Sequence, residues 1–155
     1  MDNGRNHFYV TLFSNASIDL YPDNTRAVFM THLAHSNDLG TSSSEWEVGL
    51  WEISYGGPSN ELVKGSTLVD KTIVFVYCEL VAPQFVADQN LRTLRIIDYP
   101  SRDVEHRFQN VYYLPVEKRI FPDITIQMRL MDGSTVPFEA VILPVKMVLH
   151  FRRVL

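Results

Sequence analysis

Short apolar runs separated by turn-forming clusters are the feature that most constrains the fold of this sequence. Val, Ile, Thr, Phe, Tyr and Trp gather in the runs, and Gly, Pro, Asn, Asp and Ser gather between them. Such runs are typical of β-strands, because branched and aromatic side chains pack well on a pleated surface. We find no convincing helix. Eight runs have this character: His7–Phe13, Ala27–Leu33, Glu45–Tyr55, Thr72–Leu80, Thr93–Tyr99, Glu105–Leu114, Asp123–Met131 and Val145–Val154.

Several runs alternate apolar and polar side chains with a period of two residues. The alternation is clear in the runs 45–55, 123–131 and 145–154. It is expected when one face of a sheet is buried and the other is wet, and a shift of one residue would expose every apolar side chain. The run 72–80 is apolar almost throughout, so we expect it to be a central strand covered on both sides.

The connections between the runs favour a sandwich of two sheets. Asp132-Gly133 predicts a turn, and Ala34–Ser44 predicts a polar loop. Pro83–Arg92 is either a helical turn or a long loop, and Pro137 and Pro144 bracket an extended edge segment. We predict an all-β protein, a single eight-stranded jelly-roll domain over residues 1–155. An immunoglobulin-like sandwich is the alternative, although the Cys…Trp…Cys spacing is missing.

The composition is globular and argues against several classes of protein. Of the 155 residues, 46% are hydrophobic and 21% are charged, which is too apolar for a disordered chain. The net charge of -4 argues against nucleic-acid binding. No signal peptide begins the sequence, and no apolar run approaches the roughly 18 residues of a membrane span. The single cysteine, Cys78, has apolar neighbours, so we expect a buried thiol in a protein made in the cytosol.

A metal site needs several ligands close together, and one part of the sequence offers candidates. His32 and His35 lie three residues apart where a strand passes into a polar loop, and Asp38 is near. A zinc ion takes three or four ligands, and no further His or Cys cluster follows. A solvated loop is therefore the favoured interpretation, and metal binding is the alternative.

The candidates for acid–base catalysis are Glu45, Glu47 and Glu52. Glu45 and Glu47 fall on the polar face of an amphipathic strand, where solubilising charge is expected. Glu52 falls on the face of Leu50, and we expect it to be half buried and paired with an arginine. Structural ion pairs are therefore favoured over catalysis.

The remaining polar candidates also favour structural roles. His106 and His150 lie within strand runs, where a histidine is usually a hydrogen-bonded structural residue. The basic pairs Lys118-Arg119 and Arg152-Arg153 are short, and we expect the second to cap the last strand. There is no phosphate-binding glycine loop and no nucleophile elbow. The sequence thus predicts no catalytic, cofactor-binding or metal-binding residues, and a protein that is not an enzyme.

Two adjacent aromatic pairs, Phe8-Tyr9 and Tyr112-Tyr113, lie within strand runs. Neighbouring residues of a strand point to opposite faces, so one member of each pair lies outside the core. Outward aromatic side chains are usual anchors of protein interfaces, or sugar-stacking platforms in lectin-like sandwiches. Ordinary scattered surface apolarity is the simplest alternative.

Several motifs in a fixed order, spread over nearly the whole chain, carry a resemblance to a known family. They are FYVTL (8–12), SNAS (14–17), YPDNT (21–25), WEVGLWEI (46–53), YLPV (113–116), DGSTVPFE (132–139) and LHFR (149–152). In these motifs the chain resembles the minor capsid, or penton, proteins of Maverick/Polinton elements, adintoviruses and related virophages.

The resemblance implies a structural subunit of a virion. It implies a single jelly roll that forms a homopentamer at the capsid vertex, beside a double-jelly-roll major capsid protein, and it brings no catalytic residues. A lectin-like or receptor-binding β-sandwich module is the alternative function, with an aromatic platform beside the loops 34–44 or 56–60. A cupin-like metalloenzyme would need histidines clustered inside the barrel.

Overall fold

The computed structural model is an all-β sandwich, and it describes residues 6–39, 45–55, 73–98, 104–136, 138 and 144–154. These residues contain no helix. Their strands are β1 (His7–Phe13), β2 (Val28–Asp38), β3 (Glu45–Tyr55), β4 (Ile73–Cys78), β5 (Gln84–Val86), β6 (Gln89–Leu91), β7 (Thr93–Asp98), β8 (Val104–Arg107), β9 (Leu114–Pro115), β10 (Ile120–Leu130) and β11 (Lys146–Val154).

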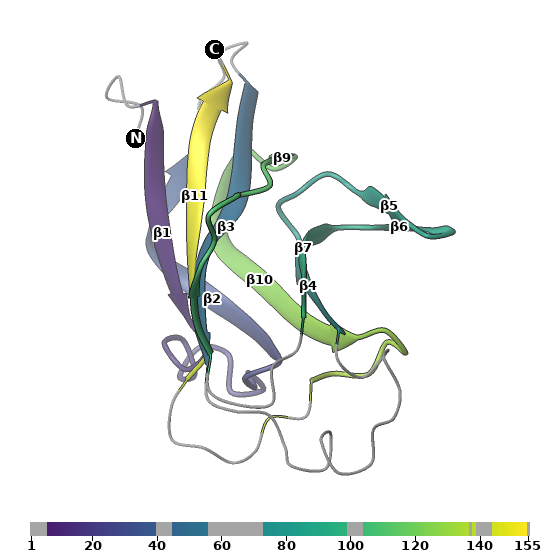
Figure 1. Cartoon of the computed structure of the whole chain (residues 1–155). Helices are drawn as coiled ribbons and strands as arrows, with labels where there is room; N and C mark the ends of the chain where they lie inside the picture. Colours follow the sequence, from purple (N-terminus) through teal and green to yellow (C-terminus); the bar gives the residue numbers. More distant parts are fainter. Residues whose placement is uncertain are drawn as a thin grey trace.

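Two antiparallel sheets form the sandwich (Figure 1). The first sheet has the order β1-β11-β3-β8, with β9 also paired to β3, and the second has the order β2-β10-β4-β7. Late strands therefore lie between early ones, since β11 separates β1 from β3 and β10 separates β2 from β4. This interleaving is the jelly-roll arrangement, so the predicted fold is confirmed.

The core lies between the sheets and follows the predicted alternation. Met147, Leu149 and Phe151 of β11 are fully buried, as is Val145 directly before the strand. So are the alternate residues Ile124, Ile126 and Met128 of β10, which face them from the second sheet. Full burial of a side chain of this size stabilises the fold by about 1.5–3 kcal/mol, which is why the register of these strands is well determined.

Strand β4 is central, as its apolar sequence predicts. It pairs with β10 on one side and β7 on the other. Val74, Val76 and Cys78 face the core, and Phe75 on the opposite face is also buried, with its ring stacked on that of Tyr77 at 6.2 Å.

The prediction of eight strands is not reproduced as such. Each predicted run contains a strand, but the sixth run divides into β8 and β9, and Pro83–Arg92 contains the hairpin β5–β6 in place of a helical turn or loop. The hairpin turns at Ala87, which has a φ of 54°. Each strand of the hairpin has only three residues, which is too short to give a clear pattern in the sequence.

The predicted loop 34–44 is partly wrong. β2 continues to Asp38 because Asn37 and Asp38 pair with Phe121 and Ile120 of β10, and this pairing outweighs the low strand propensity of the segment. A β-bulge lies between Phe121 and Asp123, at Pro122, which cannot donate to the ladder. Residues 40–44, the loop 56–60 and the middle of the predicted edge segment 137–144 lie outside the described residues.

The turn at Asp132-Gly133 forms as predicted. Gly133 has a φ of +88° and donates its N–H to the carbonyl of Leu130 at 2.9 Å. The Asp132 carboxylate accepts the N–H of Ser134 at 2.9 Å. Glycine is favoured here because L side chains rarely adopt a positive φ.

Candidate functional site

The outer face of the first sheet carries a compact group of aromatic rings, here called the His150 cluster. β11 supplies His150, β1 supplies His7 and Tyr9, β3 supplies Trp51, and Tyr113 directly precedes β9. The ring of Tyr9 stacks on that of His150 at 4.5 Å, and Trp51 meets His150 edge to face at 5.1 Å. Although it faces away from the core, His150 is only 8% exposed.

Both ring nitrogens of His150 have partners. Nδ1 lies 2.7 Å from the Tyr113 hydroxyl, and Nε2 lies 3.1 Å from Nδ1 of His7. A neutral His150 donates at one of these nitrogens and accepts at the other, and its tautomer decides which. Burial, with the nearby His7 and Arg152, lowers the pKa of His150. His150 is therefore hydrogen-bonded, as predicted.

Two arginines flank the cluster and stack on its rings. The Arg107 guanidinium lies 4.8 Å from the ring centroid of Trp51, and that of Arg152 lies 3.4 Å from the centroid of Tyr113. Arg152 also pairs with Glu47. Each cation–π contact contributes about 0.5–1 kcal/mol at an exposed site. The face thus combines aromatic rings and arginine, the side chains enriched in protein interfaces.

Gly49 allows the connection between β8 and β9 to reach this face. A Cβ at position 49 would lie 2.8 Å from the carbonyl oxygen of Tyr112 and would overlap Val111. Such contacts are too short, so a larger residue here would push the connection, and with it Tyr113, away from the sheet.

The three candidate carboxylates lie where structural charges are expected. Glu45 is exposed, and Glu47 pairs with Arg152. The prediction for Glu52 is wrong in part: it faces outward and pairs with Lys146 at 3.3 Å, not with an arginine. A bulge in the pairing of β3 with β11 changes the phase of β3, so that Ile53 takes the core position.

A second polar group lies beside β2, and sequence spacing did not reveal it. Asp123 accepts hydrogen bonds from the Tyr21 hydroxyl at 2.6 Å and from Nδ1 of His32 at 2.9 Å. The bond from Tyr21, helped by His32, lowers the pKa of Asp123. The three residues are brought together by the pairing of β10 with β2, which places Asp123 opposite His32.

The predicted alternative of a metal site at His32, His35 and Asp38 gains no support. His32 is taken up by Asp123, and the side chains of His35 and Asp38 lie outside the described part of the structure. Among the side chains that are described, no group of three His, Cys, Asp or Glu residues is arranged to hold a metal ion.

The other sequence candidates are buried, packed against rings or paired with opposite charges. Cys78 is a buried free thiol whose pKa burial raises to about 12. His106 is exposed and packs edge-on against Phe108 at 4.6 Å. Lys118 pairs with Glu79 at 3.5 Å. Arg153 stacks over Trp46 at 5.2 Å, on the opposite face from Arg152. The two arginines of this basic pair thus pack against rings on opposite faces of the last strand.

Only the first aromatic pair divides between the core and the outer face as predicted, because Tyr112 and Tyr113 lie in the connection before β9 and neither is in the core. Phe8 is 9% exposed and packs in the core, whereas Tyr9 is 49% exposed on the outer face. Tyr112 is 62% exposed, and Tyr113 joins the His150 cluster. One further contact had no sequence signal: the Arg95 guanidinium lies 4.4 Å from the ring of Tyr112 and 3.8 Å from that of Phe108, which sit on another part of the chain.

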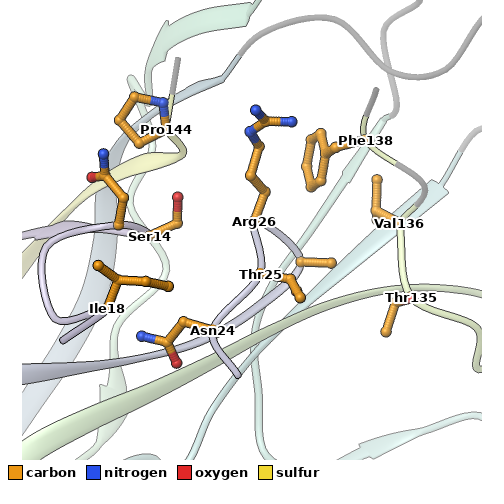
Figure 2. Close-up of a pocket in the computed structure, with 11 residues that line it drawn as sticks. Ser14, Ile18, Asn24, Thr25, Arg26, Thr135, Val136, Phe138 and Pro144 are labelled. Atoms are coloured by element: carbon orange, nitrogen blue, oxygen red, sulfur yellow. The ribbon is translucent and has the colours of Figure 1, made fainter. Parts of the chain in front are cut away.

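A hollow of about 480 Å³ lies where residues 14–18, residues 24–27 and four later residues meet (Figure 2). The four later residues are Thr135, Val136, Phe138 and Pro144. Arg26 and Phe138 line it, as do Asn24 and Ser14. The last two use their side chains internally, since Asn24 bonds the main chain of Met30 and Ser14 accepts the N–H of Val145. The hollow thus has an aromatic ring and a cation in its wall.

No helix in the described ranges is long and apolar enough to cross a membrane. No model of a known protein family matches the sequence, and no curated protein matches it. Among solved structures, the chain is similar to the crystal structure of the mavirus penton protein, with a TM-score of 0.54 and 8% sequence identity. The match covers 96% of this chain and 99% of that chain. At this identity the likeness shows a shared fold, and that fold is the one found in a viral penton protein.

Proposed function

We propose that the chain is a structural capsid subunit of the penton type, which forms a homopentamer at the fivefold vertex of a virion as one jelly-roll domain. The observation that carries the proposal is the likeness to the mavirus penton protein over 96% of the chain. The ordered motifs that resemble Maverick/Polinton penton proteins support the same function. The partner in the capsid is a double-jelly-roll major capsid protein.

The outer face of the first sheet supports an assembly role. It presents Tyr9, Trp51 and Tyr113 with two arginines on a sheet face that would be expected to be polar if it only met water. Aromatic residues and arginine carry much of the binding energy of protein interfaces. A structural subunit needs such surfaces and needs no catalytic group.

The test is the oligomeric state of the purified chain and its place in particles. Light scattering should give a mass of five chains, and electron microscopy of particles formed with the major capsid protein should place it at the vertices. Tyr9→Ser should weaken the assembly. Ile96→Ser is the matched control on the second sheet, because Ile96 is 48% exposed and Tyr9 is 49% exposed. A strict monomer at high concentration that is also missing from purified particles would refute the proposal.

A lectin-like module is the second candidate, and the hollow beside Phe138 is the observation that favours it. Glycan sites use an aromatic ring next to polar groups, and Phe138 and Arg26 both line this hollow. Binding to a glycan array that disappears in Phe138→Ala, with unchanged thermal unfolding, would support this function. Binding that is unaffected would remove it.

A further inference from the structure

β1 ends the first sheet and exposes one edge of its main chain. Arg153 donates its N–H to the carbonyl of Asn6, and Ser14 donates its N–H to the carbonyl of Val145. Hydrogen bonds in an antiparallel pair alternate along the strand, so the even-numbered residues of β1 bond to β11. The N–H and C=O groups of His7, Tyr9 and Thr11 therefore point away from the sheet.

Nothing in the described part of the chain bonds to these main-chain groups of His7, Tyr9 and Thr11. β1 lies at an outer side of the molecule (Figure 1), and a hollow of about 550 Å³ follows it along Asn6 to Tyr9. The strand also lacks lysine and proline, the residues that commonly protect an exposed edge.

β2, the outer strand of the second sheet, differs from β1 because its outer edge has hydrogen-bond partners. Side chains of the loop between β1 and β2 occupy its outward main-chain groups. Asn24 bonds both the carbonyl and the N–H of Met30, at 2.8 and 2.9 Å, as a neighbouring strand would. Thr25 accepts the N–H of Val28 at 3.0 Å, and Ser17 accepts that of His32 at 2.8 Å. The first half of the β2 edge is thus bonded at Val28, Met30 and His32, whereas the edge of β1 has no partner within the described subunit.

The hairpin β5–β6 has the complementary features. It belongs to neither large sheet, and a two-stranded ribbon is only marginally stable in water. Phe85 on it is 86% exposed, and its one charged residue in 84–91 is Asp88, whereas β1 begins with His7 beside Arg152. The hairpin extends from the side of the molecule opposite to β1 (Figure 1).

We propose that the hairpin β5–β6 of one copy adds as a strand to the open edge of β1 of the next copy. The inference rests on the proposed assembly of identical copies. The contact joins two different surfaces on opposite sides of the subunit, which is the heterologous kind of interface that closes a ring. The main-chain groups of His7, Tyr9 and Thr11 gain partners, and Phe85 is covered by the neighbouring copy.

Substitutions that block each surface test the contact. Thr11→Pro removes an N–H that faces away from β11, so the fold is retained while strand addition is lost. Thr11→Val keeps the N–H and is the matched control. Phe85→Ser removes the exposed ring of the hairpin. Light scattering should show five chains for the wild type and Thr11→Val, and a shift to single chains in the other two, with the dissociation constant raised about tenfold or more.

Cross-linking identifies which surfaces meet. Cys78 is buried, so a short bis-maleimide will react only with introduced cysteines. Thr11→Cys combined with Asn90→Cys should give a ladder of up to five linked chains, and neither single variant should. Cross-linked dimers of Thr11→Cys alone would mean that two β1 edges pair with each other, which overturns the inference.

The two proposals fail in different ways. Pentamers that persist unchanged in both Thr11→Pro and Phe85→Ser would overturn the contact and leave the penton function standing. A wild-type chain that stays monomeric and is absent from particles would overturn both.

Discussion

β1 and β2 are both outer strands of their sheets, yet the main-chain groups at their outer edges differ in whether they have hydrogen-bond partners. Three outward N–H groups of β2, at residues 28, 30 and 32, are bonded by side chains of the preceding loop. The outward groups of His7, Tyr9 and Thr11 in β1 have no such partner among the described residues. Exposed edges invite uncontrolled pairing, so closing one and leaving another open directs association to a single place. Short polar side chains in a loop can thus form the hydrogen bonds that a neighbouring strand would otherwise form with the main chain of an outer strand.

The largest expected effect comes from placing proline on each edge. Met30→Pro removes the N–H that donates to Asn24 and leaves the side-chain oxygen of Asn24 without its partner, which should cost about 2–3 kcal/mol of unfolding free energy. Thr11→Pro removes an N–H that has no partner in the subunit and should cost less than about 1 kcal/mol. Urea unfolding at a concentration below that of assembly measures both. Equal losses would mean that the two edges do not differ.

Opening the edge of β2 should have the next largest effect. Asn24→Ala deletes two hydrogen bonds to Met30 and should lower the unfolding free energy by about 1–2 kcal/mol. It also creates a second open edge, so light scattering should detect larger, irregular aggregates. Asn15→Ala, an exposed position of the same loop, is the control and should change neither quantity. Normal stability of Asn24→Ala would show that its bonds do not close the edge.

Acid should reduce the stability contributed by His150, beside β1, and by Asp123, beside β2, in different pH ranges. Burial, with His7 and Arg152, lowers the pKa of His150, so the unfolded chain binds a proton more readily than the folded one. The stability due to neutral His150 is complete above its ordinary pKa of about 6.5 and is lost as the pH falls below it. His150→Gln should flatten the dependence of the unfolding free energy on pH in this range.

At the β2 side the same reasoning gives a more acidic range. The hydrogen bond from Tyr21, with that from His32, lowers the pKa of Asp123 below 3.8. Its stabilisation is complete above the ordinary pKa and is lost as the pH falls through the lower folded value. Asp123→Asn should remove the pH dependence there and leave the neutral range unchanged. If neither substitution changed the dependence of the unfolding free energy on pH, the assignment of the two pH ranges to His150 and Asp123 would be contradicted.

The smallest expected effect on stability is that of Phe85→Ser on the hairpin. The ring is 86% exposed, so its loss should change the unfolding free energy of the subunit by less than about 0.5 kcal/mol. Chemical denaturation at low concentration measures this quantity. A larger loss would mean that Phe85 packs within its own subunit, which would weaken its assignment to a contact between copies.

Much of the fold could be predicted from periodicity, whereas the polar contacts could not. The alternation in 123–131 and 145–154 identified the faces of β10 and β11, because a strand with one buried face must repeat every two residues. The bulge that turns Glu52 outward was missed, because it depends on how β3 pairs with β11. The Asp123 group was missed because its members are up to 102 residues apart.

By itself the sequence determined an all-β chain with apolar faces, the turn at Asp132-Gly133 and the opposite directions of Phe8 and Tyr9, since these follow from local backbone geometry and side-chain period. The tertiary structure decided which strands are neighbours, which edge Asn24 closes, and that β1 is left open. These outcomes depend on main-chain hydrogen bonds between distant segments. Every residue except proline offers the same N–H and C=O groups, so the amino-acid sequence does not show which segments form those hydrogen bonds.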